Sequence, residues 1–213
     1  MASQMSMNRV IHQALRRTLD RFSGALASFP DGEAARAREL ATAWQFFYAQ
    51  FTVHHTGEHA IAWPALREVG VNGELLDQLD AEHDKIAAGL SAAGQAISTL
   101  VAAPTSASAA AARERIKELS TVAADHLAHE EAELEPVYWD KRGTPQMKEM
   151  GRKFSRDVGI SEAGSFFAWL QDGATPEENA ALRANVPAPV VTIFTAVRGG
   201  HYRRTIAPVW QAG

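Results

Sequence analysis

The stretch HLAHEEAELEP, residues 126–136, contains a histidine, a glutamate four positions later and a proline ten positions later. The earlier stretch HHTGEHAIAWP, residues 54–64, has the same three residue types at the same offsets. Side chains four positions apart lie on one face of an α-helix, so each histidine and its glutamate point the same way. The two stretches therefore predict two similar helices, each of which presents an imidazole beside a carboxylate.

Both stretches belong to long segments in which apolar residues recur every three or four positions, as they do in amphipathic helices. Turn-forming residues separate four such segments at FPDGE (29–33), VGVNG (69–73) and APTSAS (103–108). Each apolar stripe contains one histidine where a core residue is expected, and two stripes also contain a glutamate. These six polar residues are His12, His54, Glu58, His83, His126 and Glu130. We expect the second stripe to continue through Ile61 and Ala65, and the fourth through Glu133 and Val137.

The spacing of these residues predicts that they lie at one level of an up-down-up-down four-helix bundle. Two residues of an antiparallel helix pair are level when their midpoint in sequence falls at the turn. The midpoint of His12 and His54 is residue 33, at the first turn. The midpoints of Glu58 with His83 and of His83 with His126 are 70.5 and 104.5, inside the other two turns. One residue of error displaces a side chain by only about 1.5 Å, so we expect a single buried polar cluster.

A buried carboxylate is costly unless it is paired or bound to a metal ion, so this cluster favours a metal site. The repeat is regular, because His12 precedes His54 by 42 positions and His83 precedes His126 by 43. Two equivalent half-sites with two carboxylates, each able to bridge two ions, predict a dinuclear centre. Nitrogen and carboxylate donors suit iron best, with manganese and zinc as alternatives. The competing interpretation is a metal-free bundle whose histidines are hydrogen-bonded within the core.

Composition excludes several other classes of protein. The chain has 213 residues, eight histidines, no cysteine and a formal net charge of −4. The lack of cysteine excludes disulfides, thiol catalysis and iron–sulfur ligation. The chain lacks the basic excess of nucleic-acid-binding proteins, and no apolar run approaches the roughly 18 residues of a membrane span. Because residues 1–17 also lack the apolar core of a signal peptide, we expect a cytoplasmic protein without a nucleic-acid or membrane partner.

The composition changes near residue 143, after the fourth long segment. We therefore expect an all-α protein in which residues 1–143 form the bundle and residues 144–213 form a helical extension. Within the extension, Thr175, Pro176 and Glu178 have the pattern of a capped helix start.

Four motifs together carry a resemblance to a known family. They are His12, HHTGE (54–58) followed by WPALRE (63–68), AEHDKI (81–86) and HLAHEEAELEP (126–136). With these motifs the chain resembles the hemerythrin-like proteins of the HHE cation-binding group over residues 5–142. The resemblance implies a non-haem di-iron site in a four-helix bundle, with carboxylates that bridge the irons. Related proteins bind oxygen, sense oxygen or iron, or handle peroxide and nitric oxide.

The chain also departs from the oxygen-carrying members of that family. Those proteins have a second histidine four positions after the one in the third helix, where this chain has Ala87. They also have an aspartate five positions after the histidine of the fourth helix, where this chain has Glu131 preceded by Glu130. His55 is a candidate for the missing imidazole, either as a metal ligand or as a residue that supports one. We expect His59, His129, His201 and Glu133 to lie outside the ligand set.

Two functions remain open at this stage. Open coordination positions on two irons would accept a small ligand, namely O2, peroxide or NO. The first hypothesis is a redox-active di-iron protein that binds oxygen or decomposes peroxide, and so protects against oxidative or nitrosative stress. The second is a non-enzymatic sensor of oxygen, iron or redox state that signals through its C-terminal helices.

Overall fold

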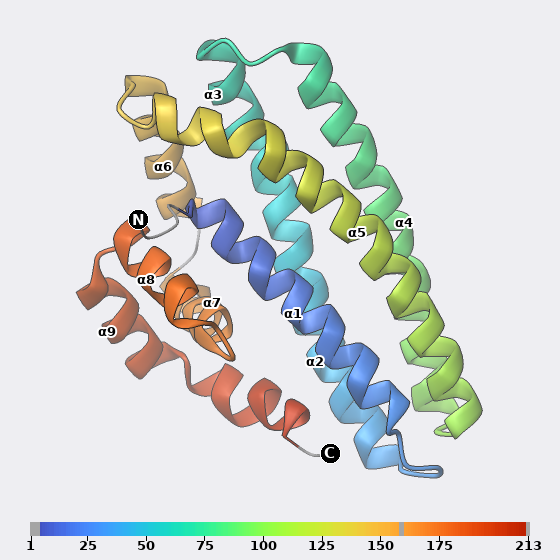
Figure 1. The fold of residues 1–213 in the computed structure, drawn as a ribbon. Coiled ribbons are helices and arrows are strands. Elements are labelled where there is room, and N and C mark those ends of the chain that lie inside the picture. The colour runs from blue at the N-terminus through green and yellow to red at the C-terminus, as the bar shows by residue number, and fades with distance from the viewer. Residues whose placement is uncertain (1–4, 158–159, 212–213) are drawn as a thin grey trace.

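The computed structural model of the chain describes residues 5–157 and 160–211. Four long helices lie side by side, and the chain reverses direction between each one and the next (Figure 1). They are α1 (Met7–Ala27), α2 (Ala34–Gly57), α4 (Gly73–Ala102) and α5 (Ser106–Lys141). The described part of the chain contains no strand. The prediction of an all-α helical bundle is confirmed.

Side-chain caps fix where three of these helices begin. Ser6 accepts a hydrogen bond from the Arg9 N–H, Asn72 from the Glu74 N–H and Thr105 from the Ser108 N–H, before α1, α4 and α5 respectively. Each cap satisfies an N–H group that the first helical turn leaves without a partner. α4 therefore starts at the end of the turn segment VGVNG, and α5 starts within the turn segment APTSAS.

The connection between α1 and α2 meets the connection between α4 and α5 at one end of the bundle. The Gly32 N–H donates to the Pro104 carbonyl at 2.7 Å, and Gly32 has a φ of +83°, which favours glycine. The N–H of Ser106 donates to the Asp31 carboxylate at 2.6 Å. α1 packs against α2 and α5, and α4 packs against α2 and α5. The four apolar stripes therefore meet in one core.

The sequence pattern predicts one continuous α-helix for the second stripe, but the structure interrupts it. After α2 the chain forms a π-helix, η1 (Glu58–Ala62), and then the short helix α3 (Trp63–Glu68). The N–H of Trp63 bonds to the carbonyl of Glu58, five residues earlier, and this wider turn brings Ala62 into the core. Ile61 is only half-buried, so the predicted continuation of the stripe through Ile61 is wrong.

The fourth stripe also continues through a different residue. α5 stays helical past Glu130, and the next buried position is Leu134, four residues later. Glu133 is exposed, so its predicted place in the stripe is wrong. The spacing of four keeps the buried face of α5 directed at the core, whereas a spacing of three would rotate it toward solvent.

The C-terminal segment is helical, as expected. Its elements are α6 (Pro145–Asp157), α7 (Ile160–Gln171), α8 (Pro176–Asn185), α9 (Ala188–Arg198), the π-helix η2 (Tyr202–Ile206) and the 3-10 helix η3 (Ala207–Trp210). α8 begins with the predicted capping box, in which Thr175 and Glu178 each accept a hydrogen bond from the other's backbone N–H. α6 packs on η1 and α3, while α7, α8 and η2 pack along α1 and α2 (Figure 1).

The C-terminal elements share a hydrophobic core with α1 and α2. Trp169 and Tyr202 are almost fully buried in the same cluster as Phe22 of the bundle. The Trp169 indole N–H donates to the buried Thr18 hydroxyl at 2.9 Å, which satisfies both polar groups in the apolar interior. Residues 163–210 therefore cover a side of the bundle that is apolar.

The described residues include no single helix that is both long enough and apolar enough to cross a membrane. α8 and α9 together satisfy the length and composition criteria, but they are bent by 107° relative to each other.

Candidate metal centre

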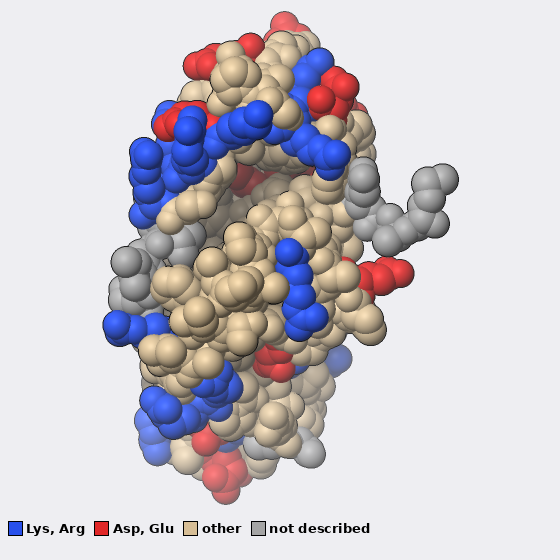
Figure 2. Space-filling model, turned by 90° about the vertical axis from the view of Figure 1, so that its left-hand side faces the viewer, with Lys and Arg blue, Asp and Glu red and all other residues tan. Residues whose placement is uncertain are grey.

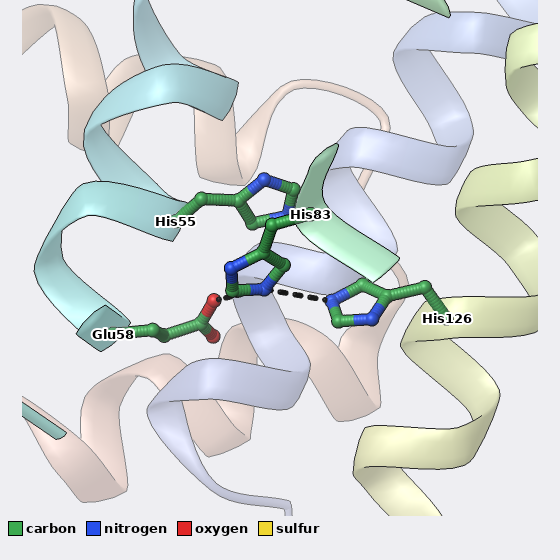
Figure 3. Close-up of side chains that lie close together, drawn as sticks. All are labelled: His55, Glu58, His83 and His126. Atoms are coloured by element: carbon green, nitrogen blue, oxygen red, sulfur yellow. Dashed lines mark hydrogen bonds and ion pairs between the residues drawn. The ribbon is translucent and has the colours of Figure 1, made fainter. Parts of the chain in front are cut away.

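The six polar residues of the four stripes meet in the interior of the bundle, as their spacing predicts. Their donor atoms form two groups in which all ligand atoms lie within 4.8 Å of one another. The first group is His12, His54, Glu58 and Glu130. The second group is His55, Glu58, His83 and His126, which Figure 3 shows converging from α2, η1, α4 and α5. Glu58 belongs to both groups, so it lies where a carboxylate could bridge two ions.

Each glutamate contacts one histidine from each half of the chain. The two oxygens of Glu58 lie 3.3 Å from His54 Nε2 and 3.4 Å from His83 Nε2. Oε2 of Glu130 lies 3.3 Å from His12 Nε2 and 4.0 Å from His126 Nε2. The histidines also pair directly, with Nε2 atoms 3.2 Å apart in His12–His54 and in His83–His126. The donor atoms thus point toward a common interior.

Several of these atoms are buried without a hydrogen-bond partner among the described residues. They are both carboxylate oxygens of Glu58, Oε2 of Glu130 and Nε2 of His55. An unpartnered carboxylate oxygen is expensive in a protein interior, and native structures rarely tolerate it. Cations held in the two groups would give these four atoms partners. The residues therefore fit a metal centre, and they fit a hydrogen-bonded metal-free core poorly.

Outer carboxylates orient two of the histidines toward the interior. Nδ1 of His12 lies 3.0 Å from Glu131, and Nδ1 of His126 lies 2.9 Å from Glu82. An N–H at Nδ1 that donates to a carboxylate leaves the lone pair of Nε2 free to bind a metal ion. Arg16 in turn donates to Glu131 at 2.6 Å, which holds that carboxylate in place.

The electrostatics of the centre favour a bound cation. Burial and the charge of Glu130 raise the pKa of Glu58 well above its ordinary value. Burial and three neighbouring histidines lower the pKa of His54 well below its ordinary value. Burial lowers the pKa of His12, but Glu130 and Glu131 outweigh that effect and leave it raised. The folded chain thus places the neutral imidazole of His54 beside a carboxyl group that lacks a positive partner, and a metal ion would supply that charge.

His55 lies within the second group of donors. Its ring stacks on the ring of His83 at a centroid distance of 3.9 Å and an interplanar angle of 12°. Burial and the neighbouring histidines lower its pKa, so the imidazole is neutral and able to donate a lone pair. His55 therefore lies where it could supply the imidazole that Ala87 does not provide on α4.

Comparison with known families agrees with this geometry. The family model described as "Hemerythrin HHE cation binding domain" matches residues 8–138, which contain both donor groups. The chain belongs to the hemerythrin HHE family. No curated protein and no solved structure gives a significant match. As a member of the hemerythrin HHE family, the chain has a cation-binding domain, and the His–Glu groups are where the structure allows metal ions to bind.

The remaining polar residues of the hemerythrin domain lie outside the two groups. His59 is exposed and contacts Asp80 at 3.0 Å, whereas His129 shares Glu82 with His126. His201 and Glu133 are exposed. Asp80 and Glu82, on the outer side of the α4 stripe, were not predicted from the sequence. Both acidic residues lie within three positions of His83, but most of the side chains that they contact belong to other helices.

Asn8 also contacts the centre and was not anticipated. Its side-chain amide donates to Oε1 of Glu130 at 2.7 Å, so only Oε2 of that glutamate lacks a hydrogen bond. Asn8 lies one turn before His12 on α1, and this i, i+4 relation is the sequence signal for it.

Proposed function

We propose that the chain binds two non-haem iron ions and that this di-iron centre binds a small ligand, namely O2, peroxide or NO. The observation that carries the proposal is the shared position of Glu58, whose two unpartnered oxygens face a histidine from each half of the bundle. Bound iron would supply open coordination positions and one-electron redox chemistry to the ligand.

Burial supports a small ligand over a larger substrate. His12, Glu58 and Glu130 are 0%, 2% and 1% exposed, and His126 is 1% exposed. A substrate of more than a few atoms would have to displace packed core residues to reach them.

The chain's own residues have separable tasks in this proposal. Glu58 and Glu130 join the two half-sites, and His12, His54, His83 and His126 complete the ligand set together with His55. Glu131 and Glu82 hold the Nδ1 protons of His12 and His126, which fixes those rings. Protection against oxidative or nitrosative stress through peroxide decomposition is the role that this arrangement favours.

Iron analysis and an absorption spectrum of the protein from iron-replete medium test the proposal. We expect about two irons per chain, with loss of iron in Glu58→Gln and retention in Glu133→Gln, a control at an exposed glutamate. Rapid peroxide turnover by the iron-loaded protein would support the protective role. A protein that binds no iron and keeps full stability would contradict the proposal.

A second candidate function is a sensor that signals through the C-terminal helices. Phe154 of α6 lies against Gly57, so closely that a Cβ atom at Gly57 would meet the ring at 2.8 Å. Gly57 directly precedes Glu58, and α6 therefore rests on the turn that carries the shared carboxylate. Slow peroxide turnover together with ligand-dependent hydrogen exchange in α6 would favour the sensor over the catalyst.

A further inference from the structure

The outer face of α9 is apolar, although the helix lies at the surface. Val190, Ile193 and Val197 are 37%, 58% and 69% exposed. Their spacing of three and four positions places them in one stripe along the helix. Val191, on the other side, is buried and anchors α9 to the core. A surface helix ordinarily turns its apolar stripe inward, whereas this face has no covering element among the described residues.

Basic side chains lie at the C-terminal end of this stripe. Arg198 ends α9, and Arg203 and Arg204 follow in η2, all of them exposed. The Arg203 guanidinium donates to the carbonyls of Thr195 at 2.6 Å and Ala196 at 3.3 Å. These bonds hold a positive charge at the last turn of α9, next to the exposed Val197. Figure 2 shows this side of the molecule as a broad region of uncharged residues, with Lys and Arg side chains and a few Asp and Glu side chains within and around it.

Charge is distributed unequally between the two parts of the sequence. Residues 141–213 contain ten Lys and Arg against six Asp and Glu, whereas residues 1–140 contain eleven against nineteen. No acidic residue follows Glu178, so the sequence of α9 and the elements after it carry only positive charge. α6 adds the exposed Lys148, Lys153 and Arg156. The molecule is thus electrically polar, with its positive part in the C-terminal segment.

We propose that the α9 stripe and its basic border form a peripheral docking surface for an anionic lipid bilayer. Helices that lie in a membrane interface combine an aliphatic face with Lys and Arg, which attract acidic headgroups. The acidic bundle would then face away from the bilayer, so the charge asymmetry orients the molecule. A second copy of the chain fits less well, because a two-fold contact through α9 would bring together two C-terminal segments that both carry an excess of positive charge.

The sequence-based expectation of no membrane partner rested on the absence of a spanning segment. A surface-bound helix does not have to satisfy that criterion, because only one face enters the interface and the backbone bonds stay within the helix. Docking through α9 also leaves the metal centre unchanged, so this proposal stands independently of the ligand that the centre binds.

Co-sedimentation of the full iron-loaded protein with vesicles tests the proposal. We expect binding to phosphatidylcholine vesicles that contain phosphatidylglycerol, weak binding to phosphatidylcholine alone, and loss of binding as salt is raised. The double variant Ile193→Asp, Val197→Asp should weaken lipid partitioning at least about tenfold. The double variant Arg198→Gln, Arg204→Gln should weaken it to a similar extent on acidic vesicles only.

Matched controls separate the α9 surface from general effects of charge and exposure. Val53 of α2 is 58% exposed, the same fraction as Ile193, so Val53→Asp tests the loss of an exposed aliphatic side chain elsewhere. Lys85→Gln with Lys117→Gln removes two exposed charges from α4 and α5. Both controls should retain lipid binding and thermal stability.

Three outcomes would overturn the proposal. The first is no binding of the folded wild-type protein to acidic vesicles, and the second is equal binding by the α9 variants. The third is a wild-type dimer that fails to bind vesicles and becomes a monomer in Ile193→Asp, Val197→Asp, which would identify a second copy as the occupant.

Discussion

The Nε2 atoms of His12 and His54 lie 3.2 Å apart in the interior of the bundle. Two imidazoles at this distance cannot both be protonated without strong repulsion, and burial adds to the cost. The pKa of His54 is lowered well below its ordinary value for these reasons, burial first. The pair therefore carries at most one positive charge, and the neutral ring of His54 can offer a lone pair to a metal ion.

The same electrostatics predict how the stability of the metal-free protein depends on pH. Burial and His126 lower the pKa of His83 to about 4 from 6.5. A folded-state pKa below the unfolded value means that neutral His83 contributes stability above pH 6.5, which is lost as the pH falls toward 4. The full loss amounts to about 3 kcal/mol. Chemical denaturation of the wild type and of His83→Leu at several pH values measures it.

The variant serves as the reference because other groups titrate in the same range. The raised pKa values of His12 and Glu58 act in the opposite direction, and both groups are present in both proteins. The stability of the wild type relative to His83→Leu should fall as the pH is lowered from 7 to 4. A difference that does not change with pH would contradict the assignment.

We predict that Glu58→Gln has opposite effects on the metal-free and metal-loaded protein. The substitution removes a buried carboxylate whose oxygens have no hydrogen-bond partner, so the metal-free form should gain about 1–2 kcal/mol. The metal-loaded form should lose stability, because metal binding contributes to the folding free energy. Thermal melts with and without a chelator measure both effects, and destabilisation of both forms to the same extent would exclude a bridging role.

Glu130→Ala is expected to destabilise the metal-loaded protein more than the metal-free protein, because metal binding contributes to the folding free energy. In the metal-free form, however, Glu130 is paired with His12 at 3.3 Å and accepts from Asn8, so some stability is lost there too. In the metal-free protein, Glu58→Gln should therefore raise the stability, whereas Glu130→Ala should lower it. Calorimetry of the two metal-free variants measures this difference, and identical shifts in their melting temperatures would contradict the prediction.

The outer carboxylates should influence metal affinity without being ligands. Glu82→Gln removes the acceptor that holds Nδ1 of His126, and metal affinity should fall about 10–100-fold. Fold and helix content should be unchanged, because Glu82 is only partly buried. Competition with a chelator of known affinity measures the change, and Glu133→Gln provides the matched control. Unchanged affinity in Glu82→Gln would show that His126 needs no such support.

The contact between α6 and the metal centre can be tested at Gly57. Alanine in a helix is ordinarily more stable than glycine by about 0.5–1 kcal/mol, but here the added Cβ would meet the Phe154 ring. Gly57→Ala should therefore stabilise the protein in a Phe154→Ala background and not in the wild type. Denaturation of the four proteins of this double-mutant cycle gives the coupling energy, and additive effects would contradict the close contact.

The shared core predicts that the bundle and residues 163–210 unfold together. Thr18→Val keeps the shape of Thr18 but leaves the buried indole N–H of Trp169 without an acceptor, which should cost about 1–3 kcal/mol. The whole protein should lose this amount in a single cooperative transition. Two separate transitions, with only one affected by Thr18→Val, would show that the C-terminal segment folds as an independent domain.

Much of the fold and of the centre could be predicted because it follows from helix periodicity. His12, His54, His83 and His126 interrupt regular apolar stripes, and midpoints at the turns place them at one level. The sequence did not reveal the π-helix, since its wider turn satisfies the same apolar pattern with a shift of one residue. It also could not place Glu82, because a polar side chain reaches a neighbouring helix only at a particular rotation of both helices.

Each glutamate contacts a histidine of the other helical hairpin, α1–α2 or α4–α5, and this has a consequence for how such a protein could arise. Glu58 reaches His83 in the other half of the chain, and Glu130 reaches His12 in the first half. Neither helical hairpin therefore holds a complete ion site by itself. A single ancestral hairpin with one His–His–Glu set would have acquired both sites only by associating with its own copy, and duplication would then have made that association permanent within one polypeptide.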